Sequence, residues 1–317
     1  MSATSTQLPR ISIVIVNYNL ADYLETAIRS VVEQEYPNLE LIVVDGGSTD
    51  GSVDIIKKYD EHITWWVSEP DEGHCPAIEK GFAKSTGEIM AWLNSDDRYH
   101  HRALWEVGKI FNQFSEVDWL MGYPTEYEPG GATINRIALP WARWSKWRYL
   151  TYDFQYIMQE STFWRRSLWE EAGSKVGHTK VAFDLELWAR FFRHAKLYTT
   201  MTLLGGFRQR GTEQTSVGRR DLYLQESAEI IKAERKRLSP LLRAWLSVQR
   251  YVAFPFGVCF FLDIPVLRRI YEAWYKLPPV IRYDFDLQKY IFSKRQYRHP
   301  NIYWRGRGIR RKVENEK

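Results

Sequence analysis

The chain has 317 residues, of which 44% are hydrophobic and 26% charged, and its formal net charge is +5. This length and hydrophobic share are sufficient for one large or two ordinary globular domains. Cys75 and Cys259 lie far apart and fit no zinc-ligand spacing, so the sequence suggests neither a disulfide framework nor a zinc site. No stretch reaches the roughly eighteen uninterrupted apolar residues of a membrane span, and the polar N-terminus has no signal-peptide core. We therefore expect a cytoplasmic protein that is not integral to a membrane.

The basic residues crowd the second half of the chain, which favours an anionic partner or a membrane surface. The 14 tryptophans are more than a core of this size needs. Because indole rings are favoured where an apolar region meets water, we expect some of them at a binding surface or a membrane interface.

The first part of the chain alternates between strand and helix patterns. Apolar, β-branched runs predict strands at 11–16, 39–45, 63–67 and 88–93, and apolar residues at helical spacing predict intervening helices at 20–32, 55–59 and 76–84. This alternation predicts a parallel, doubly wound α/β sheet with right-handed crossovers. In such sheets ligands bind outside the carboxyl ends of the strands.

The fourth predicted strand ends in Asn94-Ser95-Asp96-Asp97. Two adjacent carboxylates repel each other, and each raises the pKa of the other unless a positive charge lies between them. A bound divalent cation would supply that charge. A solvated turn with an Asx-type hydrogen bond explains the same residues without a ligand.

Polar residues also follow the other three strands, which places a candidate site at one edge of the sheet. Asp45 is suited to accept hydrogen bonds from a ribose or a base edge, and the Asp96 carboxylate to hold a metal that bridges a diphosphate. Lys80 is either a further positive charge at this site or an ordinary solvated lysine. The loop after Asp45 has neither the dinucleotide fingerprint nor a Walker phosphate loop.

The successive motifs of this half resemble those of family 2 glycosyltransferases. The matching segments are Ile13 to Asn19, Val43 to Ser52, Ser68 to Gly73, Lys80-Gly81 and Trp92 to Asp97. The likeness extends in order and spacing over roughly residues 10–210. The resemblance implies the GT-A fold, a Rossmann-like and mostly parallel α/β sheet, and the transfer of a nucleotide-activated sugar with inversion at its anomeric carbon.

The resemblance also implies roles for single residues. Asn94-Ser95-Asp96 stands at the family's Asp-x-Asp element, so Asp96 is expected to ligate a divalent metal, Mn²⁺ or Mg²⁺, with Asn94 or Ser95 near the ribose. Because Asn94 replaces the first aspartate of that element, the expected dependence on metal is weaker. The nucleotide pocket would be lined by Asn17, Tyr18, Asp45, Asp71 and Lys80.

Two segments of the second half resemble the acceptor side of the family, at 159–166 and 183–190. An inverting transfer needs one carboxylate to accept the proton of the acceptor hydroxyl as that oxygen attacks in line. Asp184 aligns best with the family's base, and Glu186 is the second choice. Acidic residues in the first turn of a helix would explain both without catalysis.

Residues 207–216 stand where the family often has Phe-Arg-x-His and a mobile loop over the diphosphate. Arg210 replaces the histidine. Arginine cannot ligate a cation but pairs directly with phosphate oxygens. We therefore expect Arg208 and Arg210 to balance the negative charge of the diphosphate leaving group. The reaction should then depend less on a metal ion.

Two basic, aromatic stretches leave a membrane contact open. The tryptophans of residues 141–147 recur at helical spacing beside basic residues, and form either part of the core or a face toward anionic lipid. Residues 219–238 predict a charged amphipathic helix. Residues 241–275 contain a long apolar run with basic and aromatic flanks, which fits either an interfacial segment or a helical subdomain packed on protein.

We divide the chain into a flexible N-terminus (1–10), a catalytic domain with a nucleotide half (11–97) and an acceptor half (98–215), and a helical C-terminal region (216–317). The leading hypothesis is a hexosyltransferase-type enzyme that transfers a sugar from a nucleoside diphosphate to a glycan or lipid-linked glycan in surface polysaccharide biosynthesis, at the inner face of the cell membrane. The alternative is a non-catalytic nucleotide-sugar or glycan-binding module of a larger assembly. The sequence does not decide whether the chain forms a homo-oligomer. A nucleic-acid partner is disfavoured because the acidic strand ends repel phosphates.

Overall fold

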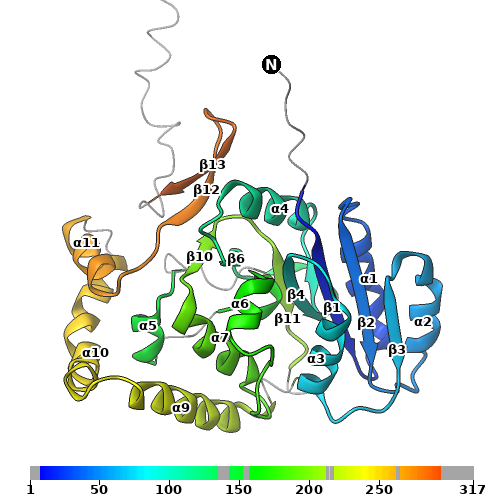
Figure 1. Ribbon diagram of the computed structural model, residues 1–317, viewed down its shortest axis with the longest axis horizontal. Coiled ribbons are helices and arrows are strands. Elements are labelled where there is room, and N and C mark those ends of the chain that lie inside the picture. The colour runs from blue at the N-terminus through cyan, green and yellow to red at the C-terminus, as the bar shows by residue number, and fades with distance from the viewer. Residues whose placement is uncertain are drawn as a thin grey trace, which may run out of the picture.

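The computed structural model describes residues 8–134, 143–152, 157–211, 214, 218–261 and 265–293. Within these ranges a nine-stranded mixed sheet has the order β13-β12-β10-β6-β9-β4-β1-β2-β3 (Figure 1). Side chains on its two faces belong to two separate hydrophobic clusters, one shared with α3 and α7 and the other with α1 and α4. This is the doubly wound α/β architecture that the alternating patterns predict.

The nucleotide half supplies four adjacent parallel strands, which are β1 (Ile11–Asn17), β2 (Leu39–Asp45), β3 (Trp65–Ser68) and β4 (Ile89–Asn94). They are joined by α1 (Ala21–Val32), α2 (Ser52–Lys58), the short η1 (Asp60–His62) and α3 (His74–Lys84). Each predicted element is present. The third strand begins later than predicted because Ile63 is still bonded to the turn, its N–H donating to the Asp60 carbonyl.

The register of these strands brings their polar ends level. Asn17 pairs with Asp45, Asp45 pairs with Ser68, and Val16 pairs with Asn94. Gly81 of α3 lies so close to β1 that a Cβ there would be 2.4 Å from a methyl of Val14. The carboxyl edge of the sheet is therefore fixed by strand pairing on one side and by tight helix packing on the other.

An antiparallel strand, β9 (Thr162–Arg165), separates β4 from the rest of the sheet. Beyond it lie β6 (Trp119–Met121), β10 (Leu197–Thr200), β12 (Val280–Asp284) and β13 (Lys289–Ser293). The helices that flank these strands include α4 (Ala103–Gln113), α6 (Arg166–Glu171) and α7 (Phe183–His194). The C-terminal region is thus not only helical, as the sequence suggested, because β12 pairs in parallel with β10 and extends the main sheet.

A second sheet, four-stranded in the described residues, has the order β5-β11-β7-β8. Its strands are β5 (Arg98–Tyr99), β11 (Gly205–Arg208), β7 (Thr125–Tyr127) and β8 (Thr133–Ile134), and the short η2 (Gln159–Ser161) lies next to β11. Residues 132–139 also have a strand-like sequence, and all of them after residue 134 lie outside the described residues. This sheet joins the end of β4 to the basic segment that follows β11.

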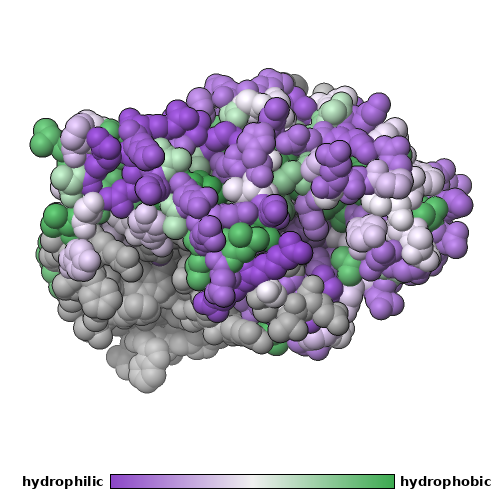
Figure 2. Space-filling model, turned by 90° about the horizontal axis from the view of Figure 1, so that it is seen from below, coloured by the Kyte–Doolittle hydropathy of each residue, from purple (hydrophilic) through white to green (hydrophobic). Residues whose placement is uncertain are grey.

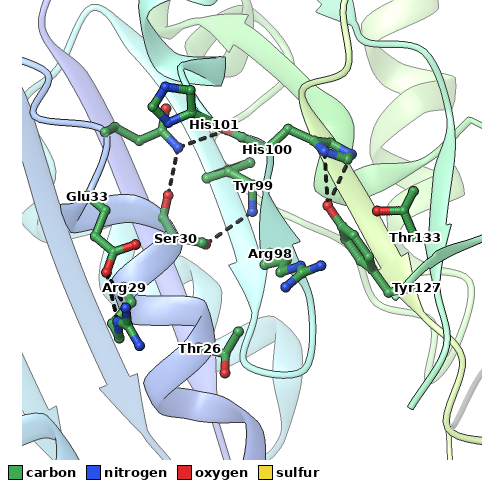
Figure 3. Close-up of a pocket in the computed structure, with 11 residues that line it drawn as sticks. Thr26, Arg29, Ser30, Glu33, Arg98, Tyr99, His100, His101, Tyr127 and Thr133 are labelled. Carbon is green, nitrogen blue, oxygen red and sulfur yellow. Dashed lines mark hydrogen bonds and ion pairs between the residues drawn. The ribbon is translucent and has the colours of Figure 1, made fainter. Parts of the chain in front are cut away.

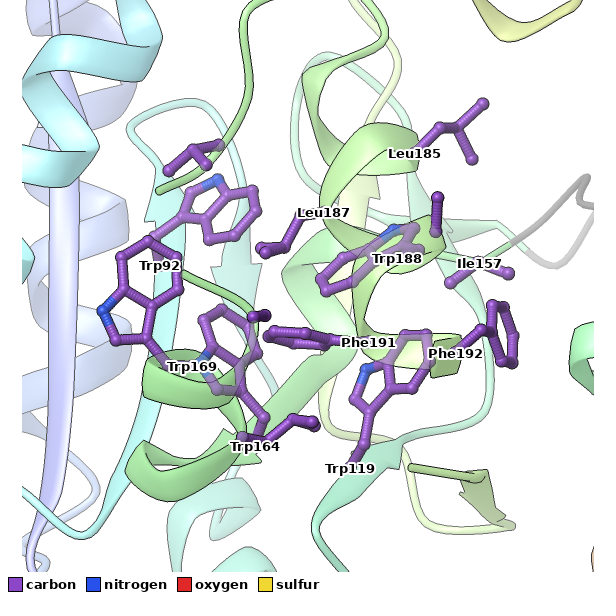
Figure 4. Packing of buried hydrophobic residues seen from close by; sticks show 14 of the residues in the cluster. Trp92, Trp119, Ile157, Trp164, Trp169, Leu185, Leu187, Trp188, Phe191 and Phe192 are labelled. Atoms are coloured by element: carbon purple, nitrogen blue, oxygen red, sulfur yellow. The ribbon is translucent and has the colours of Figure 1, made fainter. Parts of the chain in front are cut away.

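Half of the described tryptophans are buried and only one of them, Trp245, is exposed, so fewer rings lie at the surface than their number suggested. Trp92, Trp119, Trp164 and Trp188 are fully buried and contact one another edge-on or stacked between β4, β6, β9 and α7 (Figure 4). The sequence could not show this packing because the four rings come from separate elements. The contacts between these rings fix α7 on the face of the sheet formed by β4, β6 and β9.

The basic, aromatic stretch within the acceptor half also packs against protein. Its described part leads into α5 (Lys146–Leu150), and Trp144, Arg143 and Arg148 are 1%, 2% and 7% exposed. Arg143 pairs with Glu272 at 2.6 Å and donates to the Pro278 carbonyl. The lipid-facing reading of these residues is therefore wrong, and Trp141 lies outside the described residues.

Three helices, α9 (Arg220–Lys236), α10 (Pro240–Phe261) and α11 (Pro265–Trp274), form one side of the molecule (Figure 1). The ring of Trp245 stacks on that of Trp274 and meets Trp147 edge-on, so this region does pack on the catalytic half. On the face seen in Figure 2, hydrophobic residues form separate small groups within a mostly hydrophilic surface. Among the helices of the described ranges, none has the length and apolar character needed to cross a bilayer.

Candidate functional site

Asp45, at the end of β2, lies in a closed hydrogen-bond network. It is 0% exposed; Oδ1 accepts from Asn17 Nδ2 at 2.7 Å and Ser48 Oγ at 2.5 Å, and Oδ2 accepts from the Ser48 N–H at 2.9 Å and Ser68 Oγ at 2.6 Å. Burial alone would raise the pKa of Asp45, but these hydrogen bonds outweigh it and lower the pKa. Asp45 therefore fixes the loop after β2 and presents no exposed atom to a nucleoside.

The exposed part of this edge is formed by Tyr18 and Asp71, which flank Gly46. A Cβ on Gly46 would lie 3.0 Å from Asp71 Oδ2 and 3.2 Å from the Tyr18 ring. Tyr18 is 63% exposed, and the Asp71 carboxylate is oriented by the N–H of Gly73. Lys80, on α3, pairs with Glu69 at 2.7 Å and is one-third exposed. Three of the predicted pocket residues thus border solvent, while Asn17 and Asp45 support them from below.

The residues at the end of β4 are almost completely buried. Ser95, Asp96 and Asp97 are 1%, 7% and 1% exposed, and Asn94 is partly buried. The side-chain atoms Asn94 Oδ1 and Ser95 Oγ are buried with no hydrogen-bond partner in the described part of the chain. Buried oxygens without a hydrogen bond lower the stability of the fold. A ligand that donates hydrogen bonds to these two oxygens would remove that cost.

The segment after β11 closes over Asp96. Arg210 Nε donates to Asp96 Oδ2 at 2.8 Å, and Gln214 Nε2 lies 3.4 Å from the same oxygen. Arg208 is only 3% exposed and bonds the backbone, donating from Nε to the Asp96 carbonyl at 2.7 Å and from Nη1 to the Pro129 carbonyl at 2.9 Å. Arg208 thus joins β11 to β4, and of the two predicted phosphate ligands only Arg210 is placed to meet one.

Asp184 and Glu186 lie in the first turn of α7 but have different partners. Asp184 accepts from the Leu185 N–H through Oδ1, and its Oδ2 has no hydrogen bond with the described residues. Glu186 accepts from the N–H groups of His178 and Thr179 and pairs with Arg190. Burial raises the pKa of Asp184 to about 6. Asp184 thus keeps one carboxylate oxygen without a hydrogen bond to the described residues, whereas Glu186 fixes the loop before α7.

Two acidic residues without an assigned role join the cluster. Burial, followed by the nearby charges of Asp184 and Asp96, raises the pKa of Glu160 to about 8, while its own backbone N–H lowers it in part. Glu160 is 3% exposed and its Oε1 is unpaired within the described residues. Burial, Asp96 and Glu160 likewise raise the pKa of Asp97 well above its usual range. The sequence shows these carboxylates but not their burial, which comes from η2 meeting the end of β4.

His74 links the two halves of the site. At the start of α3, its ring stacks on Phe183, the residue before Asp184, at a centroid distance of 5.9 Å. Desolvation lowers the pKa of His74 while the charges of Asp96 and Asp71 oppose the shift. The starts of α3 and α7 and the end of β4 therefore converge on one place.

The residues present do not fit the predicted divalent metal at Asp96. Magnesium sites use one or two carboxylates together with substrate phosphates, but the Asp96 carboxylate already accepts a hydrogen bond from Arg210. Asp97 is buried and its raised pKa favours the neutral acid, which is a poor ligand. Across the described residues, no group of three histidine, cysteine or acidic side chains is arranged to hold a metal ion.

A polar pocket of about 350 Å³ lies elsewhere, between α1 and the second sheet (Figure 3). Its charges are already engaged, because Arg29 pairs with Glu33 and Arg98 bonds the Gly131 carbonyl and lies over the Tyr127 ring. Burial lowers the pKa of its His100 to about 4. None of the predicted site residues is among the described residues that line it.

Comparison with known proteins finds a family match in the first half of the chain. Residues 12–165, just under half of the chain, match the family model described as "Glycosyl transferase family 2". This segment is therefore similar to family 2 glycosyltransferases. The motifs that suggested the resemblance all lie in this segment, apart from those of α7 and β11.

The curated relatives cover part of the chain. An uncharacterized glycosyltransferase of Nostoc sp. is 35% identical over 130 residues, 40% of this chain and 40% of its own. The putative teichuronic acid biosynthesis glycosyltransferase TuaG of Bacillus subtilis is 37% identical over 94 residues, 29% of this chain and 37% of its own. The chain thus spans about two fifths of the length of these relatives.

Solved structures share the GT-A fold over more of the chain. S. aureus TarS 1-349 in complex with UDP-GlcNAc has a TM-score of 0.60 at 16% identity, covering 83% of this chain and 78% of that one. The mannosyltransferase PcManGT of Pyrobaculum calidifontis, in complex with GDP-Man and Mn²⁺, has a TM-score of 0.50 at 17% identity, covering 86% and 84%. The fold predicted from the sequence is therefore confirmed.

Proposed function

We propose that this protein is an inverting glycosyltransferase that moves a sugar from a nucleoside diphosphate to a glycan or lipid-linked glycan acceptor in surface polysaccharide biosynthesis. The observation that carries the proposal is Asp184, a carboxylate with a raised pKa and an unengaged oxygen that lies beside the strand ends of a domain similar to family 2 glycosyltransferases. The similarity to TuaG, a putative teichuronic acid biosynthesis glycosyltransferase, supports the process, and the TarS complex with UDP-GlcNAc supports the donor class.

The proposed reaction is a single displacement. The acceptor hydroxyl oxygen attacks the anomeric carbon, its proton passes to the Asp184 carboxylate, and the bond from the anomeric carbon to the phosphate oxygen breaks, releasing the nucleoside diphosphate. A pKa near 6 leaves Asp184 largely ionised at neutral pH yet more basic than an ordinary aspartate. Such a value suits a general base.

The proposed nucleoside site is the exposed surface of Tyr18, Gly46 and Asp71. The Tyr18 ring offers an apolar face and Asp71 an oriented acceptor, while Asn17 and Asp45 hold the loop beneath them. Asn94 Oδ1 and Ser95 Oγ, which lack partners among the described residues, are proposed to meet donor hydroxyl groups. Lys80, paired with Glu69, is proposed to lie at the border of this site.

The donor site is tested by thermal unfolding of the purified protein with UDP, GDP, dTDP and CDP, each with manganese and with EDTA. One nucleotide is expected to stabilise the fold, because a ligand at a hundred times its dissociation constant adds about 2.7 kcal/mol. The matching nucleoside without phosphate is the control. If no nucleotide shifts the midpoint in either condition, the proposed donor site is wrong. Turnover then separates the enzyme from a donor-binding module, because only the enzyme releases diphosphate from the matching nucleotide sugar.

We also propose a peripheral membrane contact through α10. Leu241, Trp245 and Val248 are 85%, 39% and 59% exposed and recur on one helical face. Exposed basic residues also occur directly after α9, at Arg237, and on α11, at Arg269. Such a combination of apolar and cationic groups favours an anionic lipid surface.

Sedimentation with phosphatidylglycerol vesicles tests this contact. Leu241→Glu with Val248→Glu should reduce the bound fraction several-fold. Leu287→Glu should not, although Leu287, in the turn between β12 and β13, is as exposed as Val248. Equal binding of both variants, or no binding of the wild type, would rule out this surface.

A further inference from the structure

We propose that Arg210 takes the place of a divalent metal, so that its guanidinium, held by Asp96, binds the diphosphate of the donor and transfer proceeds without a metal ion. The inference rests on the proposed function, because it concerns the leaving group of that reaction. It starts from the donor set at Asp96, which does not fit a metal and does hold an arginine.

Arg210 is fixed from three sides. Asp96 Oδ2 accepts from its Nε at 2.8 Å, and the Tyr23 ring lies 5.4 Å from its guanidinium carbon. Gln214 Oε1 accepts from its backbone N–H at 2.8 Å, while Gln214 Nε2 donates to the Arg208 carbonyl at 2.6 Å. Its side chain is only 13% exposed. A guanidinium held this firmly loses little further freedom when it binds a ligand.

The bonding of Arg210 leaves its terminal nitrogens for a ligand. Its side-chain hydrogen bonds within the described residues use Nε alone, so Nη1 and Nη2 keep their donors. Two parallel N–H groups match two phosphate oxygens, which is the geometry that makes arginine a strong phosphate ligand. The Asp96 carboxylate thus binds a cation that still has two nitrogens, Nη1 and Nη2, for a ligand. A metal ion bound by Asp96 would likewise keep positions for the diphosphate.

The charge around Asp96 is compatible with an anionic ligand without metal. Two guanidinium groups contact Asp96, that of Arg210 through the side-chain carboxylate and that of Arg208 through the backbone carbonyl. These two positive charges at the end of β4 favour an anionic ligand beside Asp96.

Arg208 provides the matched comparison. It is the neighbouring arginine on the same strand end and also lies over Tyr23, at 5.2 Å, but its Nε and Nη1 donate to backbone carbonyls. Replacing Arg208 should lower stability. Replacing Arg210 should lower diphosphate affinity.

The experiment measures binding by calorimetry on the full-length, EDTA-treated protein, using whichever of UDP, GDP, dTDP and CDP stabilises it, and the corresponding monophosphate. For the wild type, EDTA should change the diphosphate dissociation constant less than about threefold. Arg210→Gln should weaken the diphosphate about tenfold or more and the monophosphate much less, because the lost charge-assisted bonds belong mainly to the second phosphate. The diphosphate affinity of Arg210→Lys should lie between those of the wild type and Arg210→Gln.

The outcomes separate this inference from the proposed function. If the wild type binds the diphosphate only when manganese is restored, Arg210 does not replace the metal, while the proposed donor site stands. If no diphosphate binds in either condition, the proposed function itself fails. Equal weakening of diphosphate and monophosphate by Arg210→Gln, at an unchanged unliganded melting temperature, would place Arg210 outside the diphosphate site and overturn the inference. The EDTA comparison on the wild type decides the question even if a variant does not fold.

Discussion

The pKa values of buried aspartates shift in opposite directions in two neighbouring parts of the same sheet edge. At the ends of β1 and β2, four hydrogen bonds surround the Asp45 carboxylate and lower its pKa. At the end of β4 and the start of α7, burial raises the pKa of Asp97 and of Asp184, and Glu160 keeps an unpaired oxygen within the described residues. The donors supplied by the neighbours, and not burial itself, set the direction of the shift.

This difference separates a structural region from a reactive one. The Asp45 carboxylate accepts four hydrogen bonds, has no exposed atom and contributes to stability, although Asn17 Oδ1 beside it has no hydrogen-bond partner within the described residues. Carboxylates with raised pKa values and unpaired oxygens lower stability at neutral pH and are typical of sites that act on a substrate. The predictions that follow test this division.

The largest effect is expected for Asp184→Asn, which removes the proposed base. Loss of a general base lowers turnover by about 10² to 10⁴-fold. Glu186→Gln is the matched control, because Glu186 fixes the loop before α7 and its glutamine keeps an acceptor oxygen. Release of nucleoside diphosphate from the donor measures both. Comparable loss in the two variants would mean that Asp184 is not the base, or not the only one.

The same substitution should make the protein more stable. The folded-state pKa of Asp184 is about 6, above the ordinary value of 3.8, so its stabilising contribution is complete below about pH 4 and is lost as the pH rises through 6. Asp184→Asn should therefore gain about 1 to 3 kcal/mol at pH 8 and nothing at pH 3.5. Denaturant unfolding at the two pH values checks this. An equal gain at both would assign the effect to something other than the carboxylate charge.

The dependence of activity on pH follows from the same group. Since the base must be ionised, kcat/KM should fall about tenfold for each pH unit below 6 and level off above it. Residual activity of Asp184→Asn should lack this acidic limb. A wild-type profile whose acidic limb has its midpoint near pH 4 would indicate a base in an ordinary environment.

Much of this could be predicted from the sequence because its signals are local. Strand and helix periods gave the four parallel strands, and polar residues at strand ends gave the edge where Asn17, Asp45 and Asn94 lie. The partners of those residues could not be predicted. Asp96 meets Arg210 and Gln214 only because β11 returns beside β5 in a second sheet, a contact across more than a hundred residues.

The tryptophans illustrate the same limit. Composition alone suggested surface rings, but Trp92, Trp119, Trp164 and Trp188 come from three strands and a helix that meet on one face of the main sheet. Their number reflects how much aromatic volume that layer holds. Among the described tryptophans, Trp245 has the most exposed side chain, at 39%, and it still stacks on Trp274.

A smaller effect, on stability alone, is expected for Asp45→Asn. An amide can accept from the Ser68 hydroxyl, but its NH₂ group faces the N–H of Ser48 or the amide of Asn17, so at least one charged hydrogen bond becomes a clash of donors. We expect a loss of about 2 to 3 kcal/mol at pH 7. Because the pKa of Asp45 is lowered, its contribution is present above its unfolded pKa and disappears in acid. The deficit of the variant, measured by denaturant unfolding, should therefore shrink as the pH falls.

The smallest effect on stability is expected for Ser95→Ala, at the neighbouring strand end. Ser95 is 1% exposed, but its Oγ has no hydrogen-bond partner in the described part of the chain, so its removal takes away an unpaired group and leaves the fold within about 0.5 kcal/mol of the wild type. If Ser95 meets the donor, affinity for the nucleotide sugar should still fall. A variant as destabilised as Asp45→Asn would show that the end of β4 is a saturated structural network as well, and the contrast between the two strand ends would not hold.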